Sequence, residues 1–151
     1  MKIYAIIDTN VIISAFLTKH PDSATIQLLD YIFDRTLIPI FNEEILREYS
    51  QVLRRPKFNF SEQKITAILE AIQQSGITAE RITCNENLPD PKDIVFYEVK
   101  LAVEGSYLVT GNIKHFPKKP FVVTPSEMVR IINETLFPSG LLNDSDLAKY
   151  K

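Results

Sequence analysis

Four acidic residues lie beside predicted strands and helices, where together they could bind a divalent cation. They are Asp8, Glu48, Asp90 and Asp93. Asp8 directly follows the strand-like run Ile3–Ile7, and open α/β sheets place their ligands at the carboxyl ends of buried strands. The segment Thr110-Gly111-Asn112 follows a second strand-like run, Tyr107–Val109, and adds a hydroxyl and an amide. Several oxygen ligands without a histidine or cysteine cluster favour Mg²⁺ or Mn²⁺.

Most of these residues have a simpler explanation when each is taken alone. Asp8 and Asp93 each precede a predicted helix, and an N-cap is a common role for aspartate. Asp90 can shape the turn at Pro91, and turn chemistry accounts for the pair Gly111-Asn112. Three other polar residues are left outside the site, because local hydrogen bonding or surface exposure explains them: Asn10, His20 and His115. The order and placement of the whole set, rather than any one residue, indicate a metal site.

Glu48 is harder to explain as ordinary surface charge. It lies three residues after Ile45 and one helical turn before Val52, so it borders the apolar face of the predicted helix. A carboxylate in that place needs a partner, because burying one unpaired is costly. The partner is either a bound cation or, as the alternative, Arg47 or Arg54.

Strand and helix patterns alternate along the chain, which predicts an α/β domain with a mainly parallel sheet. The predicted strands are residues 2–7, 36–41, 79–83, 107–109 and 121–123. The predicted helices are residues 11–17, a helix from the turn at 22–23 through Phe33, then 42–54, 61–76, 93–103 and one from Pro125. Asp22 or Ser23, Asn42 and Ser61 are suitable N-caps, and residues 85–92 are a predicted loop.

Composition limits the protein to a few classes. With 151 residues, 45% of them hydrophobic, and a net charge of −2, the chain predicts one globular domain. Cys84 is the single cysteine, so neither an intramolecular disulfide nor a cysteine-based zinc site is possible. No membrane span or signal peptide is recognisable, which favours a cytoplasmic protein. The acidic balance argues against a basic nucleic-acid-coating protein but not against a nuclease, because bound cations reverse the field of clustered carboxylates.

Five segments of the chain stand in the order found in one family of nucleases. The segments are Ile6–Val11, Glu44–Tyr49, Val52–Phe58, Asp90–Asp93 and Leu108–Asn112, with His115-Phe116-Pro117 close behind. From about Ile3 to Ile132 the chain resembles the PIN-domain family. Within that family it is similar to bacterial proteins regarded as the toxins of toxin–antitoxin pairs (VapC-like).

The resemblance implies a three-layer α/β/α sandwich, and the predicted domain is residues 1–137. The small and polar residues from Pro138 predict a C-terminal tail at 138–151. The resemblance further implies an Mg²⁺- or Mn²⁺-dependent endoribonuclease whose family acids fall on Asp8, Glu48 and Asp93, with Asp90 as an added acid. In this interpretation Asp8 and Asp93 hold the cation, while Asp90 or Glu48 contacts it through water or orients the attacking water. Many PIN domains have a further aspartate where this chain has Asn112.

The resemblance also implies partners: an RNA substrate, a small antitoxin protein and a second copy of the chain. A candidate dimer surface is the helix from Ser61, because three of its predicted exposed residues carry no charge: Thr66, Gln73 and Gln74.

Two other functions remain to be weighed. A PIN-like scaffold with a decayed site would only bind a partner, and Asn112 is the one residue that favours it. A haloacid-dehalogenase-type phosphatase also begins with an aspartate at a strand end. That chemistry requires a second acid two residues later, where this chain has Asn10. Its distal acids should also follow Thr110, whereas Asp90 and Asp93 precede it.

Overall fold

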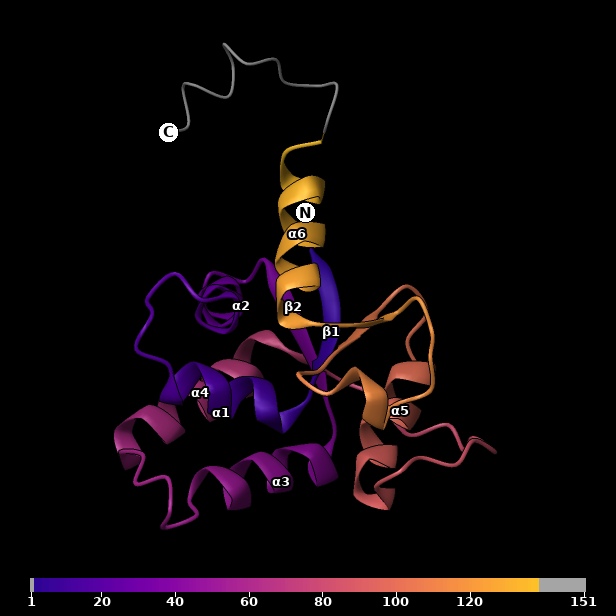
Figure 1. Cartoon of the computed structure of the whole chain (residues 1–151), viewed down its shortest axis with the longest axis horizontal. Coiled ribbons are helices and arrows are strands. Elements are labelled where there is room, and N and C mark those ends of the chain that lie inside the picture. Colours follow the sequence, from indigo (N-terminus) through magenta and orange to yellow (C-terminus); the bar gives the residue numbers. More distant parts are fainter. Residues whose placement is uncertain (1, 139–151) are drawn as a thin grey trace.

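The computed structural model describes residues 2–138, so nearly all of the predicted tail lies outside the described residues. Helices and strands alternate along the chain (Figure 1). In chain order they are β1 (Ile3–Ile7), α1 (Thr9–Leu17), α2 (Ala24–Phe33), β2 (Leu37–Phe41), α3 (Glu43–Leu53), α4 (Glu62–Ser75), β3 (Ile77–Thr78), η1 (Pro91–Asp93), α5 (Ile94–Leu101), β4 (Tyr107–Val109), η2 (Ile113–His115), β5 (Val122–Val123) and α6 (Pro125–Leu136).

The centre of the fold is a five-stranded parallel sheet with the strand order β3-β2-β1-β4-β5. β1 lies in the middle, and its residues Ala5, Ile6 and Ile7 are buried. Helices pack against the sheet: α2 and α4 contact β2, whereas α5 contacts β1 and β4. Figure 1 shows α2 and α4 to the left of the strands and α5 to their right. The predicted α/β/α sandwich with a parallel sheet is therefore confirmed.

The strand order also determines where a ligand can bind. The chain moves from β1 outward to β2 and β3, then returns past β1 to form β4 and β5. Because parallel crossovers are right-handed, this reversal places α5 on the opposite face from the earlier helices. The sheet therefore has a topological switch point between β1 and β4, and open sheets bind ligands just beyond the strands there.

Local sequence signals explain where the helices begin. Ser23, Asn42 and Ser61 each accept a hydrogen bond from the backbone amide three residues later, so the predicted caps are confirmed, with Ser23 rather than Asp22 in the second helix. Thr124 and Glu127 form a capping box ahead of α6. These bonds satisfy amide groups that the first helical turn leaves without an internal partner.

The predicted strand at residues 79–83 is wrong. β3 is Ile77–Thr78, and the ladder beside β2 extends only as far as the Ala79 amide, which donates to the Phe41 carbonyl over 3.1 Å. Beyond Ala79 the backbone turns to α5, where the Ile82 amide donates to the Glu98 carbonyl over 3.1 Å. The Ile82 amide is therefore used on a helix instead of on a sheet edge. Among residues 2–138, no helix is long and apolar enough to cross a membrane.

Candidate active site

Asp8 lies at the switch point, at the carboxyl end of the central strand. Its backbone amide extends the ladder by donating to the Val109 carbonyl over 2.9 Å. Its carboxylate is buried, with the residue 6% exposed. Asp8 occupies the N-cap position of α1, but its side chain makes no capping hydrogen bond. The helix-cap explanation therefore does not account for this buried carboxylate.

Two side chains fix the Asp8 carboxylate, one from the start of α1 and one from the end of β4. The Thr110 hydroxyl, at the end of β4, donates to Asp8 Oδ2 over 2.7 Å, and the Asn10 amide donates to the same oxygen over 3.2 Å. The Oδ1 atom of Asn10 accepts from the Gly111 amide over 3.0 Å. Asn10 thus shapes the loops, as predicted, and joins the ends of the two switch-point strands.

The ionisation of Asp8 reflects this setting. Burial raises the pKa of its carboxyl from 3.8 to about 6, against the lowering effect of the Thr110 hydrogen bond. The charges of Asp93 and Glu48 are smaller contributors to the same rise. A carboxyl group that is buried beside two other acids retains its proton more strongly than one in water.

Glu48 approaches Asp8 from α3 and is partly buried. The Thr9 hydroxyl donates a hydrogen bond to Glu48 Oε2. Burial is the main cause that raises the pKa of Glu48, and Asp93 and Asp90 add to it, while the Thr9 bond and the charge of Arg55 lower it. The alternative pairing with Arg54 is wrong, because Arg54 forms an ion pair with Glu62 at 2.6 Å.

Asp93 completes the group from the start of α5. Like Asp8, it stands at an N-cap position without a side-chain capping bond. Burial raises its pKa, and the charge of Asp90 raises it further, whereas His115 lowers it. The Nδ1 atom of His115 lies 3.4 Å from Asp93 Oδ2. Asp8, Glu48 and Asp93 therefore come from three separate elements and influence one another's ionisation.

Asp90 and Asn112 lie in more peripheral places. Asp90 Oδ1 accepts from the Lys92 amide over 3.0 Å, so it shapes the proline turn while its charge reaches Asp93 and Glu48. Asn112 is exposed, and its backbone amide donates to Thr110 Oγ1 over 3.0 Å. Within residues 2–138, no hydrogen bond connects the Asn112 side chain to the acids.

Sequence reasoning left two contributors, Thr9 and His115, out of the site, and it noted the Thr110 hydroxyl without giving it a role. Thr9 and Thr110 bond directly to Glu48 and Asp8, and His115 contacts Asp93. The position of Thr110 at the end of β4 was a usable signal, since switch-point strands end side by side. His115 follows the same strand by six residues, but nothing in its local pattern distinguishes it from a surface histidine.

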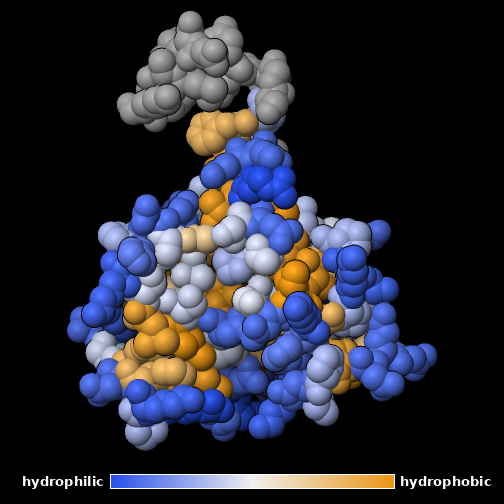
Figure 2. Space-filling view, viewed as in Figure 1, coloured by the Kyte–Doolittle hydropathy of each residue, from blue (hydrophilic) through white to orange (hydrophobic). Residues whose placement is uncertain are grey.

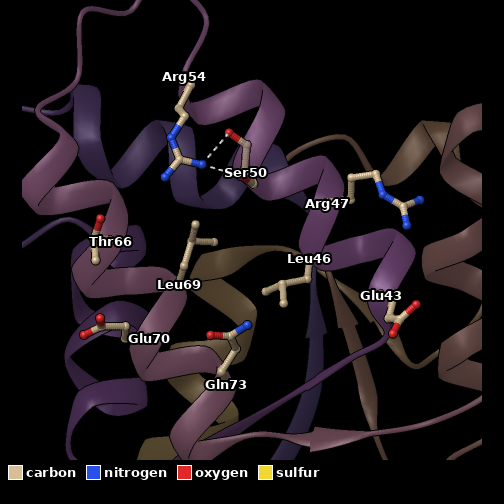
Figure 3. A pocket seen from close by; sticks show the side chains of 9 residues that line it. All are labelled: Glu43, Leu46, Arg47, Ser50, Arg54, Thr66, Leu69, Glu70 and Gln73. Atoms are coloured by element: carbon tan, nitrogen blue, oxygen red, sulfur yellow. Dashed lines mark hydrogen bonds between the residues drawn. The ribbon is translucent and has the colours of Figure 1, made fainter.

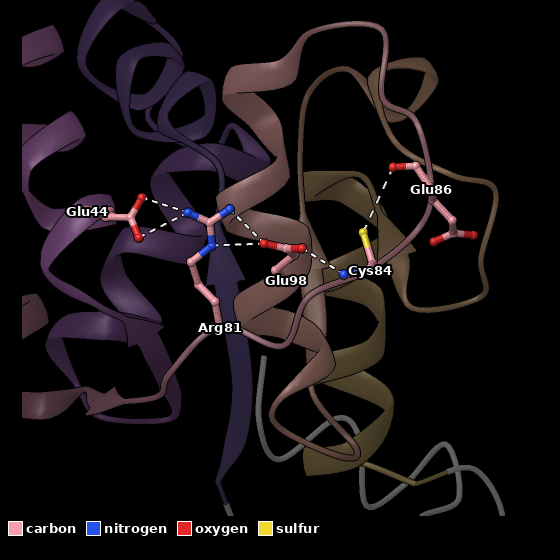
Figure 4. Close-up of polar contacts among 5 residues, drawn as sticks. All are labelled: Glu44, Arg81, Cys84, Glu86 and Glu98. Atoms are coloured by element: carbon pink, nitrogen blue, oxygen red, sulfur yellow. Dashed lines mark hydrogen bonds and ion pairs between the residues drawn. The ribbon is translucent and has the colours of Figure 1, made fainter.

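An ion-paired network secures the elements that carry the acids (Figure 4). Arg81 donates to Glu98 of α5 at 2.6 Å and to Glu44 of α3 at 2.8 Å. The other carboxylate oxygen of Glu98, Oε2, accepts from the Cys84 amide over 2.7 Å. Glu98 is 4% exposed, and its pKa is lowered by the Cys84 amide and by Arg81. The network connects the segment before Asp90 to both acid-bearing helices.

Grooves lie on both sides of α3. The larger, of about 450 Å³, lies between α3 and α4 above Leu46 and Leu69 and includes none of the four acids (Figure 3). A second groove, of about 360 Å³, includes Glu48 and is called here the basic groove. Its lining is Glu44, Arg47, Glu48, Gln51, Val52, Arg55, Lys92 and Val95. Because Glu48 lines the basic groove, this smaller groove is the one that lies beside the acids.

A family model described as PIN domain matches residues 4–114. The chain belongs to the PIN-domain family. No curated protein and no solved structure shows a significant match to it. The family assignment confirms the resemblance at the level of the PIN domain, which is a nuclease fold, and PIN nucleases typically use divalent metals.

The PIN acids suit a divalent cation by their chemistry. Among residues 2–138, no three His, Cys, Asp or Glu side chains form a ready-made ligand set. Mg²⁺ does not require one, because it keeps several of its own waters and takes one or two carboxylates. Burial is the main cause of the raised pKa values of Asp8, Glu48 and Asp93, and neighbouring carboxylates add to each rise. A cation at this position would relieve their repulsion.

Proposed function

We propose that this protein is a metal-dependent endoribonuclease, with Asp8 and Asp93 as the ligands of Mg²⁺ or Mn²⁺. The observation that carries the proposal is the buried Asp8 carboxylate. It stands at the switch point of a PIN fold, and both Glu48 and Asp93 raise its pKa. A structural role alone does not explain three acids that destabilise one another, whereas a shared cation does.

The side chains around the acids suit hydrolysis of a phosphodiester. Thr110 and Asn10 fix Asp8 Oδ2, and Thr9 fixes Glu48 Oε2, so two carboxylates are held in place before any substrate arrives. A bound cation would acidify a water molecule and offset charge on the phosphate. Glu48 or Asp90 would orient the attacking water or bind outer waters of the cation.

His115 and Asn112 have supporting roles in this proposal. His115 lowers the pKa of Asp93 and so favours the ionised carboxylate that a cation needs. Asn112 stands where many PIN domains have an aspartate, and its amide oxygen can accept a bond from a hydrated cation. Because the amide is neutral, we propose that one cation suffices.

We further propose that the protein is the toxin of a toxin–antitoxin pair and forms a homodimer, as the resemblance within the PIN family implies. Thr66 and Gln73, two residues of the predicted dimer surface, are exposed beside the groove between α3 and α4. Gln74 is also exposed but lines a different groove, with Phe33 and Arg35. Thr66 and Gln73 are thus the better candidates for a shared contact.

Cleavage of a labelled single-stranded RNA tests the nuclease proposal. The wild-type protein should cleave it with Mg²⁺ or Mn²⁺ and not in EDTA, and Asp8→Asn and Asp93→Asn should remove the activity. Asp22→Asn is the matched control, because Asp22 is exposed and is not among the charges that shift the pKa of Asp8, Glu48 or Asp93. Equal cleavage in EDTA, or full activity in either site variant, contradicts the proposal. A protein that folds but neither binds Mn²⁺ nor cleaves RNA is instead the decayed scaffold.

A further inference from the structure

The basic groove combines negative and positive charge beside the acids. Glu48 lines the groove together with three cationic residues: Arg47, Arg55 and Lys92. All three are exposed, and among residues 2–138 none has a carboxylate within ion-pair distance. Their charges are therefore available to an anionic ligand.

Arg54 and Arg55 are neighbours in the sequence with different surroundings. The guanidinium of Arg54 is engaged by Glu62, the first residue of α4. It also donates to Ser50 (Figure 3). Arg55 instead lines the basic groove, and its charge lowers the pKa of Glu48, opposing burial. Of these two arginines, only Arg55 places its charge beside the acids.

An aromatic cluster follows directly in the chain. The rings of Phe58 and Phe60 stack with centroids 5.1 Å apart and planes 5° apart, and Phe16 meets Phe60 edge to face at 5.1 Å. All three rings are partly exposed. Figure 2 shows apolar surface at the lower left of the view, over the end of α1 and the segment that enters α4, with hydrophilic surface around it. Lys57 places its ammonium 5.1 Å from the centroid of the Phe58 ring.

Helix α1 connects this cluster to the acids, because Asp8 precedes the helix and Phe16 lies near its other end. At 1.5 Å per residue, about 12 Å of helix rise separates the two positions. A single strand with about 3.4 Å per stacked nucleotide spans that distance with roughly three to four nucleotides.

Unpaired phosphate-binding cations next to flat aromatic rings are the features by which proteins bind single-stranded nucleic acid. We propose that Arg55 and its neighbours in the basic groove bind backbone phosphates of a single-stranded RNA, and that Phe58 stacks against an unpaired base a few nucleotides from the cleaved bond. This proposal rests on the proposed nuclease function and adds the residues along which the RNA lies. A base on Phe58 would displace the exposed Lys57 ammonium, which is then free to reach a phosphate.

The test measures binding separately from cleavage. A fluorescein-labelled 12-nucleotide unstructured RNA is titrated with the full-length protein in EDTA, and anisotropy gives the Kd at several salt concentrations. Arg55→Ala should weaken binding about tenfold and reduce the slope of log K against log salt by about 0.7. Phe58→Ala should weaken binding about tenfold with the slope unchanged. Arg54→Ala, the matched control, should stay within twofold of wild type.

Two further arms keep the result decisive. Phe58→Leu preserves an apolar side chain without a flat ring, so it should behave like Phe58→Ala and covers the case in which alanine unfolds the protein. The same sequence as a duplex should bind more weakly than the single strand and should not respond to Phe58→Leu. Equal effects of Arg54→Ala and Arg55→Ala overturn the proposal. So does a Phe58→Leu variant that binds RNA like wild type, and a change in its oligomeric state would then identify the aromatic cluster as a self-association surface.

The outcomes also separate this proposal from the nuclease proposal. If the variants bind as expected but the wild type does not cleave RNA with Mg²⁺ or Mn²⁺, the nuclease proposal fails and the RNA path stands. If the wild type cleaves and all variants bind equally, the path fails and the nuclease proposal stands.

Discussion

Replacing Asp8 with asparagine should stabilise the metal-free protein at pH 8 while it removes a proposed metal ligand. Asp8 has its pKa raised from 3.8 to about 6, mainly by burial. Below pH 3.8 the carboxyl is protonated in both the folded and the unfolded states. The folded state holds this proton more tightly than the unfolded state does. As the pH rises from 3.8 through about 6, the folded state must release the proton, so the free energy of unfolding falls. Asparagine carries no such proton.

The size of the effect follows from the pKa difference. A shift from 3.8 to about 6 corresponds to a loss of at most about 3 kcal/mol between low pH and pH 8. Roughly half of that loss should occur between pH 5 and pH 8. Thr110 and Asn10 both donate to Oδ2 of Asp8, so the side-chain oxygen of an asparagine at this position can accept both bonds. The Thr9 amide loses an acceptor, which costs about 1 kcal/mol. We therefore expect a net gain of about 1–2 kcal/mol at pH 8.

Urea unfolding in EDTA at pH 5 and pH 8 measures this difference. The gain from Asp8→Asn should be clear at pH 8 and should shrink or reverse at pH 5, and at pH 8 it should raise Tm by about 3–6 °C. Asp22→Asn is the control and should change the free energy of unfolding by less than about 0.5 kcal/mol at either pH. If the free energy of unfolding of Asp8→Asn depends on pH as that of the wild type does, the Asp8 carboxyl does not have the raised pKa that the structure indicates.

Three other predictions concern the surroundings of the site. Asn112→Asp should tighten Mn²⁺ binding severalfold in calorimetry and lower the stability of the metal-free protein slightly, because it restores a carboxylate near the others; unchanged affinity would place residue 112 outside the site. Glu98→Ala should lower the free energy of unfolding by about 1–3 kcal/mol, since it leaves the Cys84 amide without its acceptor and Arg81 with Glu44 alone; a loss below about 0.5 kcal/mol in urea unfolding would show that the network is dispensable. Light scattering should show a dimer that Gln73→Lys weakens, and a monomer at every concentration would reject the dimer.

The fold was largely predictable because its signals are local. The strand that ends at Asp8 and the helix cap at Asn42 follow from apolar runs and one capping side chain each. The strand predicted at 79–83 failed because the Ile82 amide and the Arg81 side chain bond to Glu98, a residue that lies on a later helix. No pattern within residues 79–83 reports that long-range competition.

The candidate site was predictable in its acids but not in the residues that hold them. Asp8 and Asp93 stand at element boundaries, where strand ends and helix starts attract attention from sequence alone. The contacts of Thr9 with Glu48 and of His115 with Asp93 depend on how three elements meet. Their partners are distant in sequence, so only the folded arrangement shows them.

The central claim is that Asp8, Glu48 and Asp93 together bind one divalent cation. Titration calorimetry with Mn²⁺ at pH 6, in two buffers of different ionisation enthalpy, tests it most directly. The wild type should bind one Mn²⁺ and release about half a proton from Asp8, because its carboxyl titrates near pH 6 and must be deprotonated to bind metal. Asp8→Asn and Asp93→Asn should lose the binding, while Asp22→Asn should retain it. Equal Mn²⁺ affinity in the wild type and in Asp8→Asn would contradict the account.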